Sequence, residues 1–230
     1  MVGRPVGSCI PAPLDHPSLL ARATARLASL STRTAPPAVF TALGNHSRLF
    51  RAWLPFGSTL LLAGRLPRRE AELVILRTAW ACNGWYEWTQ HVDLAVRAGL
   101  TPAQVSGVPA WRAHAGFTDR QRTLLRATDE MLADRVVCDS TLAELREHLD
   151  PRQVIELCLL VGHYEMLAMT LNTLRVTPDE GSMRCAPDDA RDLAERLRGH
   201  LAEAQSERHE SPHEENGDSP WNTRSGASRS

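Results

Sequence analysis

Residues 66–101 read LPRREAELVILRTAWACNGWYEWTQHVDLAVRAGLT, and this stretch decides the fold. Its apolar residues recur at the three- and four-residue spacing of a helix rather than in alternation. Pro67 suits the first turn of a helix, Gly84 marks a break and Gly99 a stop. The stretch therefore predicts one helix over 67–82 and a second over 85–98.

The rest of the chain carries the same signals, and no segment reads convincingly as a strand. Side chains suited to capping boxes begin three helices, at Thr101, Thr118 and Asp150. Outside the opening stretch, the sequence predicts a short helix that ends at about 43 and helices over 47–62, 150–176 and 188–205. Two further helices are predicted to begin near 101 and 118. Short loops join them, so we expect an all-α helical bundle.

Composition divides the chain into four predicted parts. Residues 1–17 are rich in Pro and Gly and are expected to be extended, and residues 18–180 form the helical domain. Residues 181–205 supply a C-terminal helix. Residues 206–230 are polar and nearly free of aliphatic side chains, which predicts a disordered tail.

Charge and composition exclude several classes of function. The net charge is −1 and the pI about 6.8, which gives no electrostatic case for nucleic acid or an anionic membrane. All 26 basic residues are Arg, so lysine Schiff-base chemistry is excluded. The five cysteines form no C-x-x-C pair and no apolar leader precedes the domain, so we expect the cytoplasm. The apolar run 157–174 is interrupted by polar residues and is expected to be a core helix.

Two carboxylates and an imidazole are predicted to point inward on consecutive helices. Glu87 and His91 are four residues apart and share a helix face with apolar neighbours. Glu72 lies on the apolar face of the preceding helix. Such a cluster suits proton transfer near neutral pH. Two other interpretations stay open: a purely structural hydrogen-bond network, and a metal site, for which the spacing matches no known motif. We expect no metal.

Four further residues are candidate substrate contacts. Cys82, Tyr86 and Trp88 are close to Glu87 and His91 in sequence, and His163 lies on the long helix predicted over 150–176. Core packing is the alternative for Trp88 and His163, and an inert buried thiol is the alternative for Cys82.

The opening stretch resembles the carboxymuconolactone decarboxylase family, which belongs to the alkylhydroperoxidase-D-like superfamily. The resemblance rests on Glu72, the Y-E-W-x-x-H segment of residues 86–91 and the A-x-x-A-G-L-T ending of residues 95–101, and extends over about 36–178. It implies the helical fold of that superfamily and a homo-oligomer, whether dimer, trimer or hexamer. The peroxidase branch carries C-x-x-C-x-x-x-H, but the two cysteine positions here are Gly84 and Glu87. Thiol peroxidase activity is therefore not expected.

The decarboxylase branch carries E-x-x-x-H, which Glu87 and His91 match. The resemblance implies a lyase without cofactor that acts on a small carboxylated or lactone-type metabolite. His91 would donate the proton or bind the oxyanion, Glu87 would orient it, and Glu72 would complete the relay. The alternatives are another proton-transfer enzyme (isomerase, dehydratase or cyclase) and a non-catalytic homologue that binds a small molecule.

Overall fold

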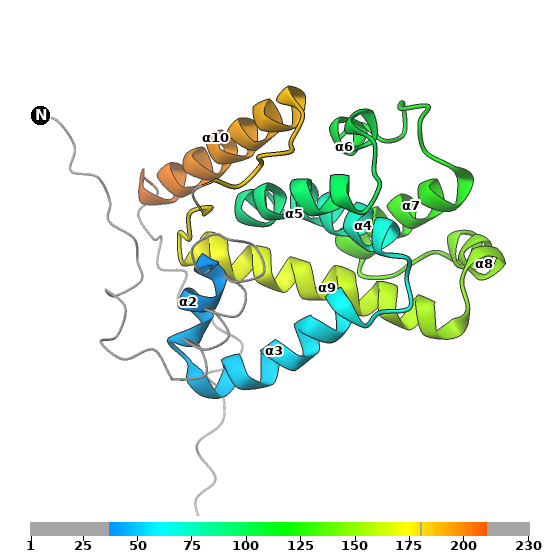
Figure 1. Cartoon of the computed structure of the whole chain (residues 1–230), viewed down its shortest axis with the longest axis horizontal. Coiled ribbons are helices and arrows are strands. Elements are labelled where there is room, and N and C mark those ends of the chain that lie inside the picture. The colour runs from blue at the N-terminus through cyan, green and yellow to red at the C-terminus, as the bar shows by residue number, and fades with distance from the viewer. Residues whose placement is uncertain (1–36, 180, 211–230) are drawn as a thin grey trace, which may run out of the picture.

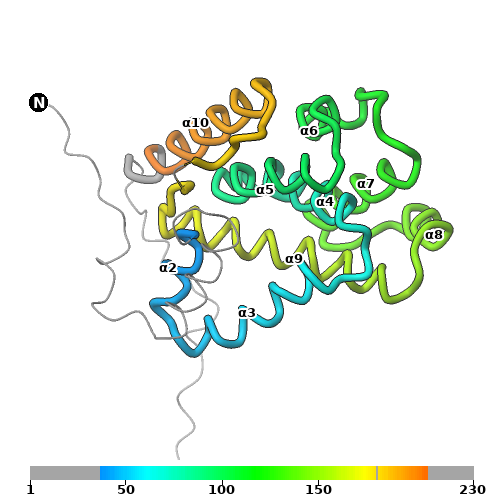
Figure 2. Tube along the Cα trace, in the orientation of Figure 1, coloured from blue at the N-terminus to red at the C-terminus, as the bar shows by residue number. Residues whose placement is uncertain are grey.

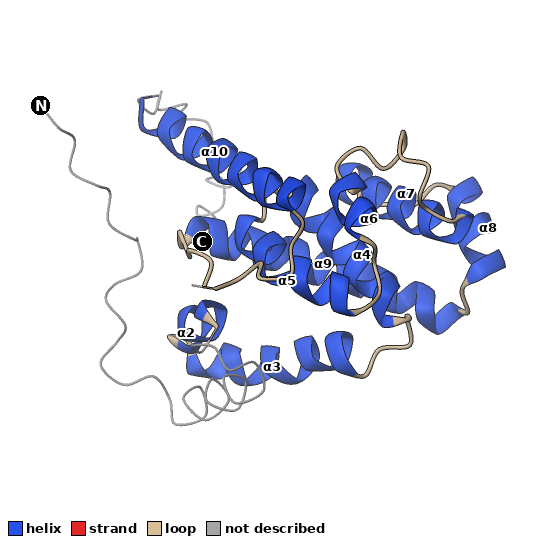
Figure 3. Ribbon diagram, turned by 45° about the horizontal axis from the view of Figure 1, so that its top comes forward, coloured by secondary structure: helices blue, strands red, loops and turns tan. Residues whose placement is uncertain are grey.

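The computed structural model describes residues 37–179 and 181–210, and every regular element in these ranges is an α-helix (Figures 1 and 3). In chain order the helices are α2 (Ala38–Gly44), α3 (Ser47–Leu62), α4 (Arg68–Ala81), α5 (Trp85–Arg97), α6 (Pro102–Gly107), α7 (Asp119–Asp134), α8 (Asp139–His148), α9 (Pro151–Thr173) and α10 (Asp188–Glu210). The predicted all-α class is confirmed.

Helix α4 is the centre of the bundle and packs against α5, α7 and α9 (Figure 2). Its residues are buried on almost every side, as is typical of a helix enclosed by others. Leu73 and Leu76 of α4 enter one core, which it shares with α5 and α10. Val74 and Ile75 enter a second core, shared with α7, α8 and α9. A polar side chain on α4 is therefore held between rigid layers.

The capping residues explain where several helices begin. Thr101, Thr118 and Asp150 each accept from the backbone N–H three residues on, and a glutamine side chain at that position returns the bond, so all three boxes are present. Helix α8 was not predicted. Its N-cap, Cys138, gives no side-chain cap bond, although Leu142, Leu145 and Leu149 have helical spacing.

Two predicted helix ends differ from the structure. Helix α9 ends at Thr173 rather than at 176, because Arg175 takes a left-handed backbone conformation with a φ of 55°. Helix α10 continues to Glu210, beyond the predicted end at 205. The predicted extended segment 1–17 and the tail beyond 210 lie outside the described residues.

Helix α10 packs against α5 and α6 (Figure 1). Its buried face places Leu193 and Leu197 in the same core as Trp88. The indole N–H of Trp88 donates to the carbonyl of Ala190 over 3.2 Å. The C-terminal helix is therefore part of the core.

Helix α9 is long and apolar enough to cross a membrane, with a mean hydropathy of 1.5. It packs instead against α3, α4, α5, α7 and α8. Among the residues that the structure describes it is the one helix that passes this test, and its packing supports the prediction of a core helix.

The outer sides of α3 and α9 expose apolar side chains. On α9 the residues Ile155, Leu159, Met166 and Met169 repeat at intervals of about one or two turns, so they share one face. An open groove of about 770 Å³ between α2, α3 and α9 reaches this face at Met166 and includes Phe56 of α3. Large apolar side chains that are exposed together on one helix face are candidates for an interaction surface. We propose that a second copy of the chain covers this face, which would give the homo-oligomer implied by the resemblance.

This proposal predicts that two charges placed on the face dissociate the assembly. The Leu159→Glu/Met166→Glu double variant is expected to elute as a monomer in light-scattering chromatography, whereas the unmodified chain elutes as a dimer or larger. Val136→Glu is the control, because Val136 is 63% exposed but lies between α7 and α8. A monomeric unmodified chain would contradict the proposal.

Candidate active site

The turn between α4 and α5 sets the geometry of the site. Helix α4 ends because Asn83 takes a left-handed backbone, with a φ of 51°, and the N–H of Gly84 donates to the carbonyl of Ala79 over 2.7 Å. Gly84 has a second role: a Cβ atom there would lie 2.8 Å from Oε2 of Glu87. The glycine therefore leaves room for the Glu87 carboxyl group beside the turn.

Glu72 of α4 holds His91 of α5. Its Oε2 lies 2.8 Å from Nδ1 of His91, and Glu72 itself is completely buried. Arg68, one turn earlier, forms an ion pair with Glu72, with Nη2 2.5 Å from Oε1. Because the Glu72 carboxylate can only accept, the bond assigns a proton to Nδ1 and leaves Nε2 as the working nitrogen of His91.

Glu87 is buried without a partner. It is 2% exposed, and neither of its carboxyl oxygens has a hydrogen-bond partner among the described residues. Burial raises the pKa of this carboxyl group from 4.5 to about 7, because the charged form loses its hydration. Glu87 can therefore both give and take a proton at neutral pH.

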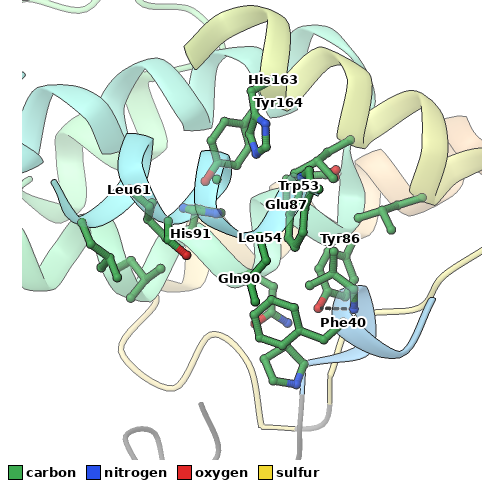
Figure 4. Close-up of a pocket in the computed structure, with 18 residues that line it drawn as sticks. Phe40, Trp53, Leu54, Leu61, Tyr86, Glu87, Gln90, His91, His163 and Tyr164 are labelled. Carbon is green, nitrogen blue, oxygen red and sulfur yellow. Dashed lines mark hydrogen bonds between the residues drawn. The ribbon is translucent and has the colours of Figure 1, made fainter. Parts of the chain in front are cut away.

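A cavity of about 260 Å³ lies beside Glu87 and His91 (Figure 4). Glu87 and His91 line it from α5, and α2, α3 and α9 supply its other walls. Its lining side chains are mostly apolar or aromatic, among them Phe40, Leu54, Leu61, Tyr164, Leu167 and Leu171. A small apolar cavity with a few polar groups is typical of a small-molecule site.

His163 faces the same cavity from α9 and stacks on Trp53 of α3, with ring centroids 5.9 Å apart and an interplanar angle of 12° (Figure 4). Burial, together with the nearby His91, lowers the pKa of His163 to about 4, so its ring is neutral at pH 7. Nδ1 of His163 and Nε1 of Trp53 are both buried without hydrogen-bond partners among the described residues.

The predicted site residues divide into two groups. Glu87, His91, Tyr86 and His163 line the cavity, and Glu72 contacts His91 from behind. The hydroxyl of Tyr86 is already engaged: it donates to Oδ2 of Asp179 over 3.0 Å and accepts from the N–H of Val39.

Cys82 and Trp88 were predicted as substrate contacts and do not line the cavity. Cys82 is the C-cap of α4, and Trp88 is fully buried in the core. Burial, and secondarily Glu165 and Glu87, raises the pKa of the Cys82 thiol to about 11, which disfavours the reactive thiolate. Both predicted contacts are therefore corrected.

The predicted relay needs one further correction. Glu87 was expected to orient His91, but Nδ1 of His91 donates instead to Glu72, on the neighbouring helix. Sequence reasoning also missed Trp53, Arg68 and Gln90. Gln90 lines the cavity, and its side-chain amide donates to the hydroxyl of Ser182 over 2.8 Å.

The burial of Glu87 predicts a pH-dependent stability. Between pH 4.5 and about 7 the folded chain keeps a proton that the unfolded chain has released. The free energy of unfolding therefore falls as the pH rises through this window, by up to about 1.4 kcal/mol per pH unit from this group, and the effect levels off above it. Glu87→Gln should remove this slope. Urea unfolding of both proteins from pH 5 to 8 measures it, and parallel pH profiles would contradict the assignment.

Comparison with known proteins agrees with the resemblance. Residues 47–130 match the model of the carboxymuconolactone decarboxylase family. No curated protein matches the sequence significantly.

Solved structures share the fold. An alkylhydroperoxidase AhpD core, an uncharacterized peroxidase-related protein from Ralstonia eutropha JMP134, is 21% identical with a TM-score of 0.68, over 77% of this chain and 95% of that chain. A peroxidase-related protein from Silicibacter sp. TM1040 is 16% identical with a TM-score of 0.69, over 77% and 96%. A variant of the debrominase Bmp8 in complex with 2,3,4-tribromopyrrole is 12% identical with a TM-score of 0.63, over 83% and 99%. The predicted alkylhydroperoxidase-D-like fold is confirmed.

Proposed function

On the premise that the chain carries a carboxymuconolactone decarboxylase-like domain, we propose that it is a small-molecule enzyme that works by proton transfer, as a decarboxylase-like lyase. One observation carries the proposal: Glu72 fixes His91 through Nδ1, which leaves Nε2 for the cavity, next to the unpartnered acid Glu87. A group held on one side and free on the other is suited to acid–base catalysis. The same fold binds a small ring compound in the debrominase Bmp8.

The reaction that fits this arrangement starts from a ring metabolite with a carboxyl group next to a conjugated carbonyl. The bond between the ring carbon and the carboxyl carbon breaks, CO₂ leaves, and the electron pair moves into the carbonyl as a dienolate. A proton from His91 or Glu87 is then added to carbon, so that one proton is consumed for each CO₂ released. If the substrate is a lactone that keeps all its atoms, the same groups move a proton from one carbon to another.

Each polar group has a proposed role in this scheme. His91 carries the proton at Nε2, and Glu72 is a positioning residue that keeps its tautomer. Glu87 is the second acid, since burial keeps much of its carboxyl group protonated near pH 7. The free indole N–H of Trp53 donates to the developing oxyanion. The other candidates are an isomerase, dehydratase or cyclase using the same groups, and a non-catalytic binding protein.

Mass spectrometry in D₂O tests the proposal without knowledge of the substrate. The purified protein is incubated with a panel of small cyclic carboxylates and lactones, and the products are searched for loss of CO₂ and for deuterium bound to carbon. Loss of CO₂ identifies a lyase, and deuterium without that loss identifies an isomerase. A compound that binds tightly and undergoes neither change would favour the non-catalytic alternative.

Cys82 is expected to be dispensable, because its thiol is half-buried at the end of α4 and lies outside the cavity. Cys82→Ser should keep most of the activity found in the D₂O assay. The same pair of proteins should reduce hydrogen peroxide no faster than buffer when a dithiol donor is supplied. Peroxide turnover that Cys82→Ser abolishes would replace the lyase proposal with a thiol-dependent one.

A further inference from the structure

The cavity contains three buried polar side chains that nothing in the described structure satisfies. They are the indole N–H of Trp53, both oxygens of Glu87 and Nδ1 of His163, and all three residues line the same space. A buried polar atom without a partner is costly, and such atoms are seldom left unpaired. Their convergence indicates a ligand that supplies partners to an N–H donor, to a carboxyl group and to a neutral imidazole.

The same cavity offers no unpaired positive charge. None of the described residues that line it is an arginine, and the chain has no lysine. Arg68 is engaged by Glu72, which lies between it and His91. His163 is neutral near pH 7. If His91 becomes protonated, Glu72 already faces its charge. An anionic ligand would therefore lose its hydration without gaining a counter-ion, and it would also meet Glu87.

The shape of the cavity favours a flat ring. The Trp53 and His163 rings stack nearly parallel, and the ring of Tyr164 stands nearly perpendicular to those of His91 and His163. Gly57 of α3 adds no side chain to this part of the wall, where a Cβ atom would lie in ordinary van der Waals contact, 3.4 Å from the ring of His163. A volume of about 260 Å³ exceeds the ~150 Å³ cavity that holds benzene and accommodates one or two fused rings.

We propose that the substrate is an uncharged, planar ring compound with a carbonyl group, which accepts from the indole N–H of Trp53 and lies against the carboxyl group of Glu87. This inference rests on the proposed function and narrows it, because it selects the lactone-type substrate over the free carboxylate. Of the two schemes given for the proposed function, it therefore selects the second, transfer of a proton between carbons of an intact lactone, and sets aside loss of CO₂ from a carboxylate.

Calorimetric binding of three probes of similar size tests the substrate class. The probes are 2-coumaranone, an uncharged planar lactone; 2-hydroxyphenylacetate, the anion formed when that lactone ring opens; and indane, which has the same ring skeleton and no polar atom. At pH 7.5 the lactone is expected to bind at least about tenfold more tightly than the anion, because the charge of the anion would be buried without a counter-ion. It should bind several-fold more tightly than indane, because it gains one hydrogen bond. An anion that binds as tightly as the lactone overturns the proposal, as does a lactone that does not bind.

Two variants assign the polar contact. Trp53→Phe keeps a ring in the wall but removes the N–H, so the advantage of the lactone over indane should disappear. Trp85→Phe is the matched control, because Trp85 is half-buried in the other core and does not line the cavity, and it should leave all three affinities unchanged. Equal effects of the two variants would remove Trp53 from the proposal.

His91→Asn separates this inference from the proposed function. This variant should still prefer the lactone over the anion, because the preference depends on the other cavity residues. Selective binding of the lactone, with no proton exchange in D₂O by the unmodified protein, would refute the proposed function and leave the ligand class standing. If the unmodified protein exchanged protons on carboxylates alone, the proposed function would stand and the proposed ligand class would be refuted.

Discussion

Replacing His91 with asparagine is expected to lower kcat by at least about a hundredfold on the substrate found in the D₂O assay, because general acid–base help is worth about 10²–10⁴-fold. Asparagine fills a similar space and can still donate to Glu72, but it does not titrate. Glu72→Gln should also lower kcat, since the neutral amide no longer stabilises a charged His91. The double variant should lose little more than the worse single one, because Glu72 and His91 act as a unit.

The contrasting interpretation is a structural network, and it predicts the opposite pattern. Turnover per folded molecule would stay near normal, while the free energy of unfolding would fall by about 1–3 kcal/mol as buried groups lose partners. Measuring kcat and urea unfolding on the same four proteins separates the two. His200→Asn is the matched control, because His200 lies exposed on α10, away from the cavity. Normal turnover in a destabilised His91→Asn protein would withdraw the catalytic role.

Much of the fold was predictable because local signals decide it. Capping boxes at Thr101, Thr118 and Asp150 place three helix starts, and apolar spacing places the helices around them. Helix α8 escaped prediction because its start lacks a side-chain cap. The boundary at 205 was wrong because the polar composition beyond that point was taken as disorder, although an exposed helix end can be equally polar.

The candidate site was predictable only in part. Helical periodicity alone places Glu72, Glu87 and His91 on inward faces. The partner of each group depends instead on how two helices cross, which the turn at Asn83 and Gly84 decides. Sequence spacing therefore assigned Glu87 to His91, whereas the three-dimensional contact belongs to Glu72.

The cavity depends on still longer-range packing. Its walls come from helices distant in sequence, so Trp53 could be recognised only as an aromatic residue suited to a core. Trp88 shows the converse error, since it was predicted to contact the substrate but lies in the core. It follows Glu87 directly in sequence, and its side chain therefore points to another side of α5, into the core shared with α10. Neighbours in sequence along a helix point about 100° apart, which is enough to separate site from core.

Helix α10 should contribute strongly to stability although it follows the matched family segment, residues 47–130. Leu197 is completely buried in the core that also contains Trp88 and Val92 of the site helix. Truncating a buried leucine to alanine removes apolar contacts and leaves a cavity, which costs about 2–5 kcal/mol. We therefore expect Leu197→Ala to lower the free energy of unfolding by that amount in urea or thermal denaturation.

Leu62→Ala is the matched control for this prediction, since it is the same substitution at a side chain that is 79% exposed. It should change the free energy of unfolding by no more than about 0.5 kcal/mol. The cooperativity of the transition gives a second readout. If α10 and α5 form one core, Leu197→Ala should shift a single transition, because the loss reaches the site helix through Trp88 and its bond to Ala190. An early separate transition, with the main one unchanged, would show that α10 unfolds alone and leaves the domain that carries His91 intact.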